Sequence, residues 1–152
     1  MSTLLKNVTI IDATSPYHNQ KKDILISDGK LEKIANSIPK KDNYTVLELE
    51  NLHVSCGWFD TSVSLGEPGF EERETIKNGL QVAAKSGFTS IAINANTFPV
   101  IDSKSDVEYL INKAFNTATN LYPIAALTKG SNGLEMAELY DMQQSGAIAF
   151  GD

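Results

Sequence analysis

The chain has few of the side chains that perform most metal and acid–base chemistry. Its 152 residues include only two histidines, His18 and His53, one arginine, Arg73, and one cysteine, Cys56. Imidazole is the commonest metal ligand and general base, and guanidinium is the usual partner of a carboxylate. A single cysteine forms neither an internal disulfide nor a thiolate zinc cluster by itself, which favours a reducing compartment. These scarcities limit the chemistry that the chain can support.

Long apolar runs and excess positive charge are also missing. No stretch of about 18 apolar residues occurs, and no basic segment followed by an apolar core opens the chain. The sequence therefore predicts no membrane span and no secretory signal, and a cytoplasmic location is expected. The net charge of −6 argues against a nucleic-acid partner. With 41% hydrophobic and 21% charged residues, the composition is that of a globular protein.

Residues 1–53 are predicted to form a β module. Leu4–Ile11 is rich in strand-forming residues, and Ile24–Ile26 is followed by Asp28-Gly29, a dipeptide suited to the positive φ angles of a tight hairpin turn. Val46–Glu50 alternates apolar and acidic residues, as a half-exposed strand does. A small sheet is the simplest structure that fits these segments.

Residues 54–152 change to strands that alternate with helices, which is the signature of parallel βα units. A closed (β/α)8 barrel needs about 250 residues, so this part supplies roughly half of one. The last predicted strand, Ala147–Phe150, is apolar and has no covering helix, so we expect a truncated chain or an obligate assembly, with self-association through that edge. The expected strands begin at Trp58 and cover Phe88–Ile93, Tyr122–Leu127 and Ala147–Phe150. The expected helices cover Glu72–Ser86 and Leu134–Gln144, and a third helix begins at a capping box formed by Ser105–Glu108.

Three segments of this second part carry a family resemblance. Gly57–Gly69 (GWFDTSVSLGEPG) resembles the first barrel strand of the dihydroorotases, which belong to the amidohydrolase superfamily. Asn94–Asp102 (NANTFPVID) is similar to the family's Met-Pro-Asn-Thr-x-Pro loop after strand two, and the segment from Leu127 to Asp152 resembles the run into strand four. The resemblance implies an α/β fold with an N-terminal β-sandwich-like module, built from both chain ends, and the first half of a TIM-type (β/α)8 metal-dependent hydrolase barrel.

The resemblance also implies which positions would do the chemistry. Dihydroorotases bind one or two zinc ions and open or close the cyclic amide that links carbamoyl aspartate and dihydroorotate. Their first strand reads Asp-x-His-x-His-x-Arg, and the period of two places both imidazoles on one face of the strand. In this chain Asp60 is kept, whereas Ser62 and Ser64 stand at the histidine positions and Gly66 at the arginine position. A serine hydroxyl is a poor zinc ligand, and glycine offers no cation to a substrate carboxylate.

Two further family positions match. Asn96 corresponds to the loop asparagine that contacts substrate, and Asp152 to the strand-four acid that joins the metals. We predict Asn96 as a substrate-binding residue and Asp152 as a vestigial metal ligand, with no catalytic residue and no cofactor expected in this chain, although the family uses zinc. The competing interpretations are a turn residue for Asn96 and a frayed terminal acid for Asp152. Cys56 is expected to be buried and inert.

Two functions follow from the resemblance. The first is a dihydroorotase-like protein of pyrimidine biosynthesis that is catalytically inactive and has a structural or regulatory role, with aspartate transcarbamoylase as a partner that the resemblance implies. The second is an active amidohydrolase of altered specificity, acting on cyclic amide C–N bonds and completed by residues absent from this chain. A homo-oligomer is expected in either case, and neither nucleic acid nor membrane is an expected partner.

Overall fold

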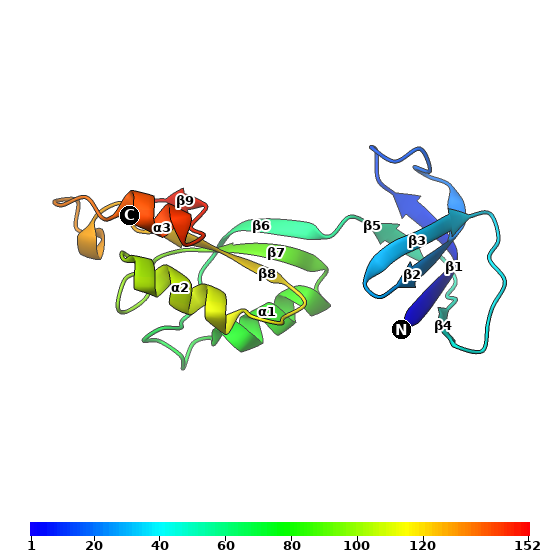
Figure 1. The fold of residues 1–152 in the computed structure, drawn as a ribbon, viewed down its shortest axis with the longest axis horizontal. Coiled ribbons are helices and arrows are strands. Elements are labelled where there is room, and N and C mark those ends of the chain that lie inside the picture. The colour runs from blue at the N-terminus through cyan, green and yellow to red at the C-terminus, as the bar shows by residue number, and fades with distance from the viewer. The chain divides into compact units, whose positions relative to one another are not determined.

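The computed structural model describes residues 1–152, which form two compact units, Met1–Cys56 and Gly57–Asp152 (Figure 1). The sequence places the boundary after His53, whereas the first unit continues to Cys56. The reason is that His53–Ser55 forms a strand, β5, that pairs with the first strand of the chain. No helix is long and apolar enough to cross a bilayer. Each unit is described by itself.

The first unit is a five-stranded sheet. Strands β1 (Ser2–Ile11), β2 (Lys21–Ser27) and β3 (Lys30–Ala35) are antiparallel neighbours. The remaining two, β4 (Tyr44–Leu47) and β5, both pair with β1 in parallel, β4 along its beginning and β5 along its end. Between β2 and β3, Asp28 and Gly29 have φ angles of 49° and 75°, which confirms the predicted hairpin turn. The strand predicted at Val46–Glu50 exists but ends at Leu47.

A buried carboxylate fixes the irregular part of this sheet. Asp23 on β2 accepts hydrogen bonds from the backbone N–H groups of Asn7 and Ile38, and its other contact is the ammonium of Lys6. The pairing of β1 with β2 shifts register between Leu5 and Val8, where Asn7 has a φ of 53°. Burial opposes the ionised form of Asp23, but the hydrogen bonds from Lys6, Asn7 and Ile38 outweigh it and lower its pKa.

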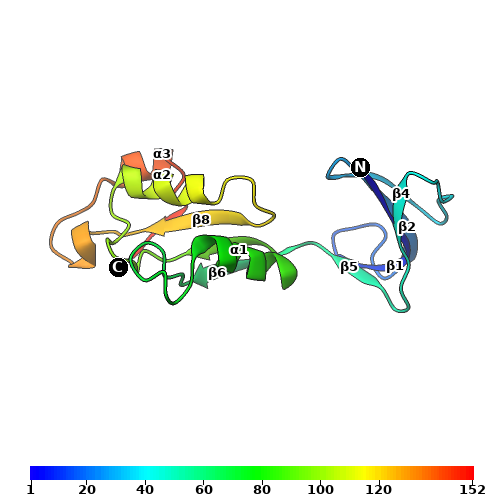
Figure 2. The same cartoon turned by 90° about the horizontal axis from the view of Figure 1, so that it is seen from below.

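The second unit contains a four-stranded parallel sheet in the order β6-β7-β8-β9 (Trp58–Val63, Phe88–Ile93, Asn120–Ala125 and Ala149–Phe150). The three crossovers carry helices α1 (Ile76–Lys85), α2 (Lys104–Lys113) and α3 (Leu139–Gln144), with α1 and α2 running beside the sheet (Figures 1 and 2). Apolar side chains of α1, α2, β7 and β8 form one core. This is the α/β half-barrel that the sequence predicts, and β7 has the predicted bounds.

Helices α1 and α3 begin later than the sequence predicts. Helix α1 starts at Ile76, because the Thr75 hydroxyl accepts a hydrogen bond from the Asn78 N–H, and the acidic residues before it belong to a loop. Helix α3 starts at Leu139, and Leu134 is 86% exposed in the preceding loop. The last strand is present but reduced from the predicted Ala147–Phe150 to Ala149–Phe150, and Ile148 before it is 50% exposed.

The cap of α2 is Ser103, two residues before the predicted one. Its hydroxyl accepts a hydrogen bond from the Asp106 N–H at 3.4 Å, and the Asp106 carboxylate accepts one from the Ser103 N–H at 3.1 Å, which completes a capping box.

Replacing Ser103 by alanine is expected to cost about 1 kcal/mol of unfolding free energy. Ser105→Ala is the matched control, since Ser105 contacts only the Ser103 hydroxyl and should cost less than half as much. Urea unfolding of both variants measures the difference, and equal losses would contradict this cap assignment.

Candidate functional site

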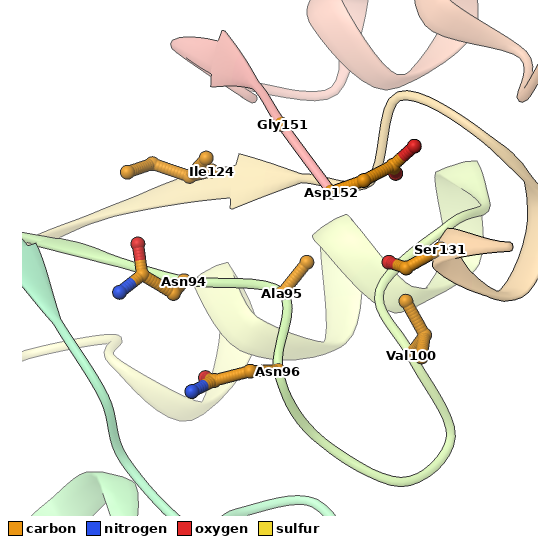
Figure 3. Close-up of a pocket in the computed structure, with 8 residues that line it drawn as sticks. All are labelled: Asn94, Ala95, Asn96, Val100, Ile124, Ser131, Gly151 and Asp152. Carbon is orange, nitrogen blue, oxygen red and sulfur yellow. The ribbon is translucent and has the colours of Figure 1, made fainter. Parts of the chain in front are cut away.

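Polar side chains gather at the carboxyl ends of the four parallel strands. We call this group the strand-end site: Ser62 and Ser64 at the end of β6, Asn94 and Asn96 after β7, Ser131 after β8 and Asp152 after β9. The carboxyl ends of parallel strands lie at one edge of a sheet, and barrel enzymes place their catalytic groups at this edge. A cavity of about 430 Å³ opens there, and Asn94, Asn96, Ser131 and Asp152 are among its lining residues (Figure 3).

The first two strands bring serines and asparagines into direct contact. Val63 pairs with Ile93, and the Asn94 N–H donates to the Val63 carbonyl at 2.9 Å, so the chain continues its pairing past the strand ends. The Asn96 side-chain amide donates to the Ser64 hydroxyl at 2.8 Å. The Asn94 amide donates to the Ser62 hydroxyl at 3.2 Å and to Ser64 at 3.5 Å. Ser62 and Ser64 thus share one face, as the period of two predicts, and they belong to a network of neutral groups.

Asp152 is anchored. Its carboxylate accepts hydrogen bonds from the N–H groups of Leu127 and Thr128, at 3.1 and 3.0 Å, and from the Thr128 hydroxyl at 2.7 Å. These bonds, above all the one from the Thr128 hydroxyl, lower its pKa and keep the carboxylate ionised. The interpretation as a frayed terminal acid is therefore wrong. Asp152 holds the start of the loop after β8, on the opposite side of the cavity from Asn96 (Figure 3).

Gly66, which the resemblance places at the arginine position, is enclosed by backbone. Its N–H donates to the Glu74 carbonyl at 2.9 Å, and its own carbonyl accepts from the Phe70 N–H at 2.8 Å. A Cβ atom at Gly66 would lie 1.9 Å from the Phe70 carbonyl oxygen, a distance that no real Cβ contact shows. The loop Gly66–Glu74 therefore folds over the point from which an arginine side chain would leave the backbone.

The residues of the strand-end site do not fit the zinc that the resemblance implies. Ser62 and Ser64, which only the resemblance places at the family's histidine positions, carry hydroxyls that are hydrogen-bonded to amides, and zinc sites in proteins are built from imidazole, thiolate and carboxylate. Asp60 accepts a hydrogen bond from the Ser62 N–H at 3.1 Å. Nowhere in residues 1–152 do three or more His, Cys, Asp or Glu side chains gather as a metal-binding group. Both histidines belong to the first unit.

The prediction from the sequence misses two residues of the strand-end site. Asn94 and Ser131 do not appear among the predicted site residues, although the alternation Asn94-Ala95-Asn96 just after a buried strand is a signal for the former. Cys56, expected to be buried, is exposed, with its Sγ 3.6 Å from the Asp12 carboxylate. That prediction is wrong because Cys56 follows the edge strand β5 of the first unit, where no other element covers it.

The parallel sheet, its crossover helices and a polar site at the carboxyl ends of the strands define half of a (β/α)8-type barrel. Among solved structures, the chain is similar to the L-hydantoinase (dihydropyrimidinase) of Arthrobacter aurescens, with a TM-score of 0.78, 19% identity, and coverage of 97% of this chain and 32% of that one. It is also similar to a dihydroorotase crystal structure, with a TM-score of 0.64, 15% identity, and coverage of 98% and 41%. These structural similarities show the fold of the chain.

Residues 53–152 match the family model described as dihydro-orotase-like, and the chain belongs to that family. It is 40% identical over 152 residues to the dihydroorotase of Pelotomaculum thermopropionicum and 38% identical over 154 residues to that of Syntrophus aciditrophicus. Both matches cover the whole of this chain and 35% and 36% of those proteins. The chain therefore spans about a third of the length of these relatives.

Proposed function

We propose that the protein is a dihydroorotase-like protein of pyrimidine biosynthesis that does not catalyse the cyclic amide reaction and has a structural or regulatory role. One observation carries this proposal. The two serines at the positions of the first-strand histidines are joined to Asn94 and Asn96 by hydrogen bonds, so a neutral hydroxyl–amide network occupies the place of metal ligands. Membership of the dihydro-orotase-like family supports a place in pyrimidine biosynthesis. The hydroxyl and amide groups, which are poor zinc ligands, support the absence of catalysis.

The reaction needs a bound metal and a group that holds the substrate carboxylates. A catalytic zinc generally has three protein ligands, and the loss of two from one strand leaves too few for tight binding. The closed backbone at Gly66 removes the position from which an arginine would reach a carboxylate. Residues of this chain therefore support neither metal activation of water nor recognition of the anionic substrate. In the structural role we propose, the partners are a second copy of the protein and aspartate transcarbamoylase.

Metal content and turnover test this function together. The purified protein is expected to contain far less than one zinc per chain by inductively coupled plasma mass spectrometry, even after incubation with zinc and removal of the excess. It should also cyclise carbamoyl aspartate at mildly acid pH no faster than the uncatalysed reaction. The dihydroorotase of Pelotomaculum thermopropionicum, prepared in the same way, is the control. Stoichiometric zinc together with turnover would refute the proposal and favour an active amidohydrolase of altered specificity.

A further inference from the structure

A groove lies between α1 and the loop that leads from α2 to β8. One wall is a face of α1, on which Lys77 and Lys85 are the first and last lining residues, and the other wall is the loop 116–118. Leu80, 1% exposed, and the half-buried Ala84 give the groove an apolar floor. Its volume of about 510 Å³ is within the size range of binding sites.

Hydroxyl groups fix the loop wall of this groove. The Thr117 hydroxyl lies 2.7 Å from the Ala114 carbonyl and 2.9 Å from the Thr119 carbonyl. Thr119, itself buried, donates its hydroxyl hydrogen to the Phe88 carbonyl at 2.7 Å, which ties the loop to the first residue of β7. The groove is therefore formed before any ligand arrives, and a preformed site loses less conformational entropy on binding.

The groove holds the two basic side chains of the second unit that have no acidic partner. This unit contains twelve acidic and six basic side chains, and Lys77 and Lys85 are both exposed. No acidic residue lines the groove. Two unpaired ammonium groups in an otherwise acidic unit favour a negatively charged ligand at this place. The other four basic side chains are in ion pairs: Arg73, Lys104, Lys113 and Lys129.

The spacing of the two lysines fits an extended peptide. Lys77 and Lys85 are eight residues apart, which is about 12 Å along the axis of a helix. An extended peptide rises by about 3.3 Å per residue and points residues i, i+2 and i+4 to one side, so acidic residues at i and i+4 are about 13 Å apart. The side chain at i+2 then faces the apolar floor. The side-chain amides of Gln81 and Asn116 also line the groove, make no hydrogen bond within the chain, and can bond to a peptide backbone.

We infer that this groove docks an extended acidic segment of a partner protein, with the pattern acidic-x-apolar-x-acidic. The two lysines pair with its carboxylates, and the apolar side chain between them covers Leu80. Phe115, which precedes the loop wall in the chain, is 85% exposed, and aromatic side chains are enriched at protein interfaces. The inference goes beyond the proposed function, because it uses no residue of the strand-end site.

A blocked pentapeptide tests the docking groove. The probe is acetyl-Glu-Ser-Leu-Ser-Glu-amide, and in the control peptide glutamine replaces both glutamates. In proton–nitrogen correlation spectra of the protein, the probe should shift the amide signals of residues 77–86 and 115–118 in a saturable way. The control peptide should bind about fivefold more weakly, which is the effect of two exposed ion pairs, and salt should reduce the difference. No saturable shift of these signals, or equal binding of the two peptides, would overturn the inference.

Charge reversal locates the groove. The double variant Lys77→Glu/Lys85→Glu should lose binding of the acidic probe and gain binding of acetyl-Lys-Ser-Leu-Ser-Lys-amide, an exchange that a folding defect cannot produce. Lys104→Glu is the control, because Lys104 is an exposed lysine of α2 that pairs with Glu108 and does not line the groove. Its affinity for the acidic probe should be that of the wild type. A double variant that keeps the acidic probe would refute this site.

Other occupants of the groove give different results. Pyrophosphate represents a compact anion, and binding of it at this groove as tight as that of the acidic probe would overturn the inference in favour of a small-anion site. A second copy of the chain in the groove would appear in sedimentation velocity as a dimer that Lys77→Glu/Lys85→Glu dissociates, and this result would also overturn it. Zinc content and turnover, which test the proposed function, affect neither readout.

Discussion

Replacing Gly66 by alanine is expected to destabilise the second unit by about 3 kcal/mol, which is the upper part of the range for overpacked sites. The added Cβ would lie 1.9 Å from the Phe70 carbonyl oxygen and 3.0 Å from that of Glu74. Both atoms belong to backbone that is hydrogen-bonded to Gly66 itself, so neither can move without breaking those bonds. The only tryptophan, Trp58, lies on β6, and its fluorescence during urea unfolding reports on this unit.

Gly151→Ala is the matched control for that substitution. Gly151 follows β9 in the same unit, has no positive φ angle, and has open space where a Cβ would be. Its replacement should change the unfolding free energy by less than about 0.5 kcal/mol. If Gly66→Ala were as mild as the control, the loop Gly66–Glu74 would have room for side chains, and the argument that an arginine is excluded there would fail.

The same packing affects any attempt to restore the family pattern. Histidines at positions 62 and 64 replace exposed serines and are sterically possible, whereas Gly66→Arg encounters the backbone of Phe70 before its guanidinium reaches any ligand. The conformation of the whole loop therefore excludes an arginine side chain at position 66. An arginine at this position would require remodelling of Gly66–Glu74, and substitution of the glycine alone would not suffice.

Local signals account for the parts of the fold that the sequence predicts well. The turn at Asp28-Gly29 depends on two residues that tolerate positive φ, and β7 is a short run rich in strand-forming residues that lies between Gly87 and Asn94. The order of strands and helices in the second unit follows from hydrophobic periodicity. The same spacing puts Ser62 and Ser64 on one face, which the hydrogen bonds to Asn94 and Asn96 confirm.

Other features depend on contacts between segments distant in sequence. The first residue of α1 is set partly by Glu67, nine residues earlier, whose carboxylate accepts a hydrogen bond from the Ile76 N–H. The network of the strand-end site joins residues about thirty positions apart, and spacing alone does not reveal which asparagine meets which serine. The closure around Gly66 requires the path of the whole loop. The exposure of Cys56 likewise depends on the arrangement of strands at the edge of the sheet in the first unit.

Glu67 is the other position where a large effect is expected, because its buried carboxylate joins three segments. It accepts hydrogen bonds from the Ile76 N–H and the Tyr109 hydroxyl, both at 2.9 Å, and pairs with the Lys113 ammonium at 2.8 Å. Glu67→Ala should cost about 3 kcal/mol, since α1 loses a partner for its first N–H and α2 loses its connection to the loop after β6. Trp58 fluorescence during urea unfolding measures the loss. Glu138→Ala is the control, because that exposed side chain makes no hydrogen bond.

The ionised form of Glu67 should also make the stability of this unit depend on pH. Burial works to raise the pKa of the carboxyl, but the hydrogen bonds from Lys113, Ile76 and Tyr109 outweigh it and lower the pKa below its ordinary value of 4.5. The unfolded chain then binds the proton more readily than the folded one, so the stabilisation is complete above about pH 5 and is lost as the pH falls below 4.5. In Glu67→Gln this contribution is absent, and the gap in unfolding free energy between wild type and variant should narrow from pH 7 to pH 3. A gap that stays constant over this range would show that the charge of Glu67 contributes nothing to folding.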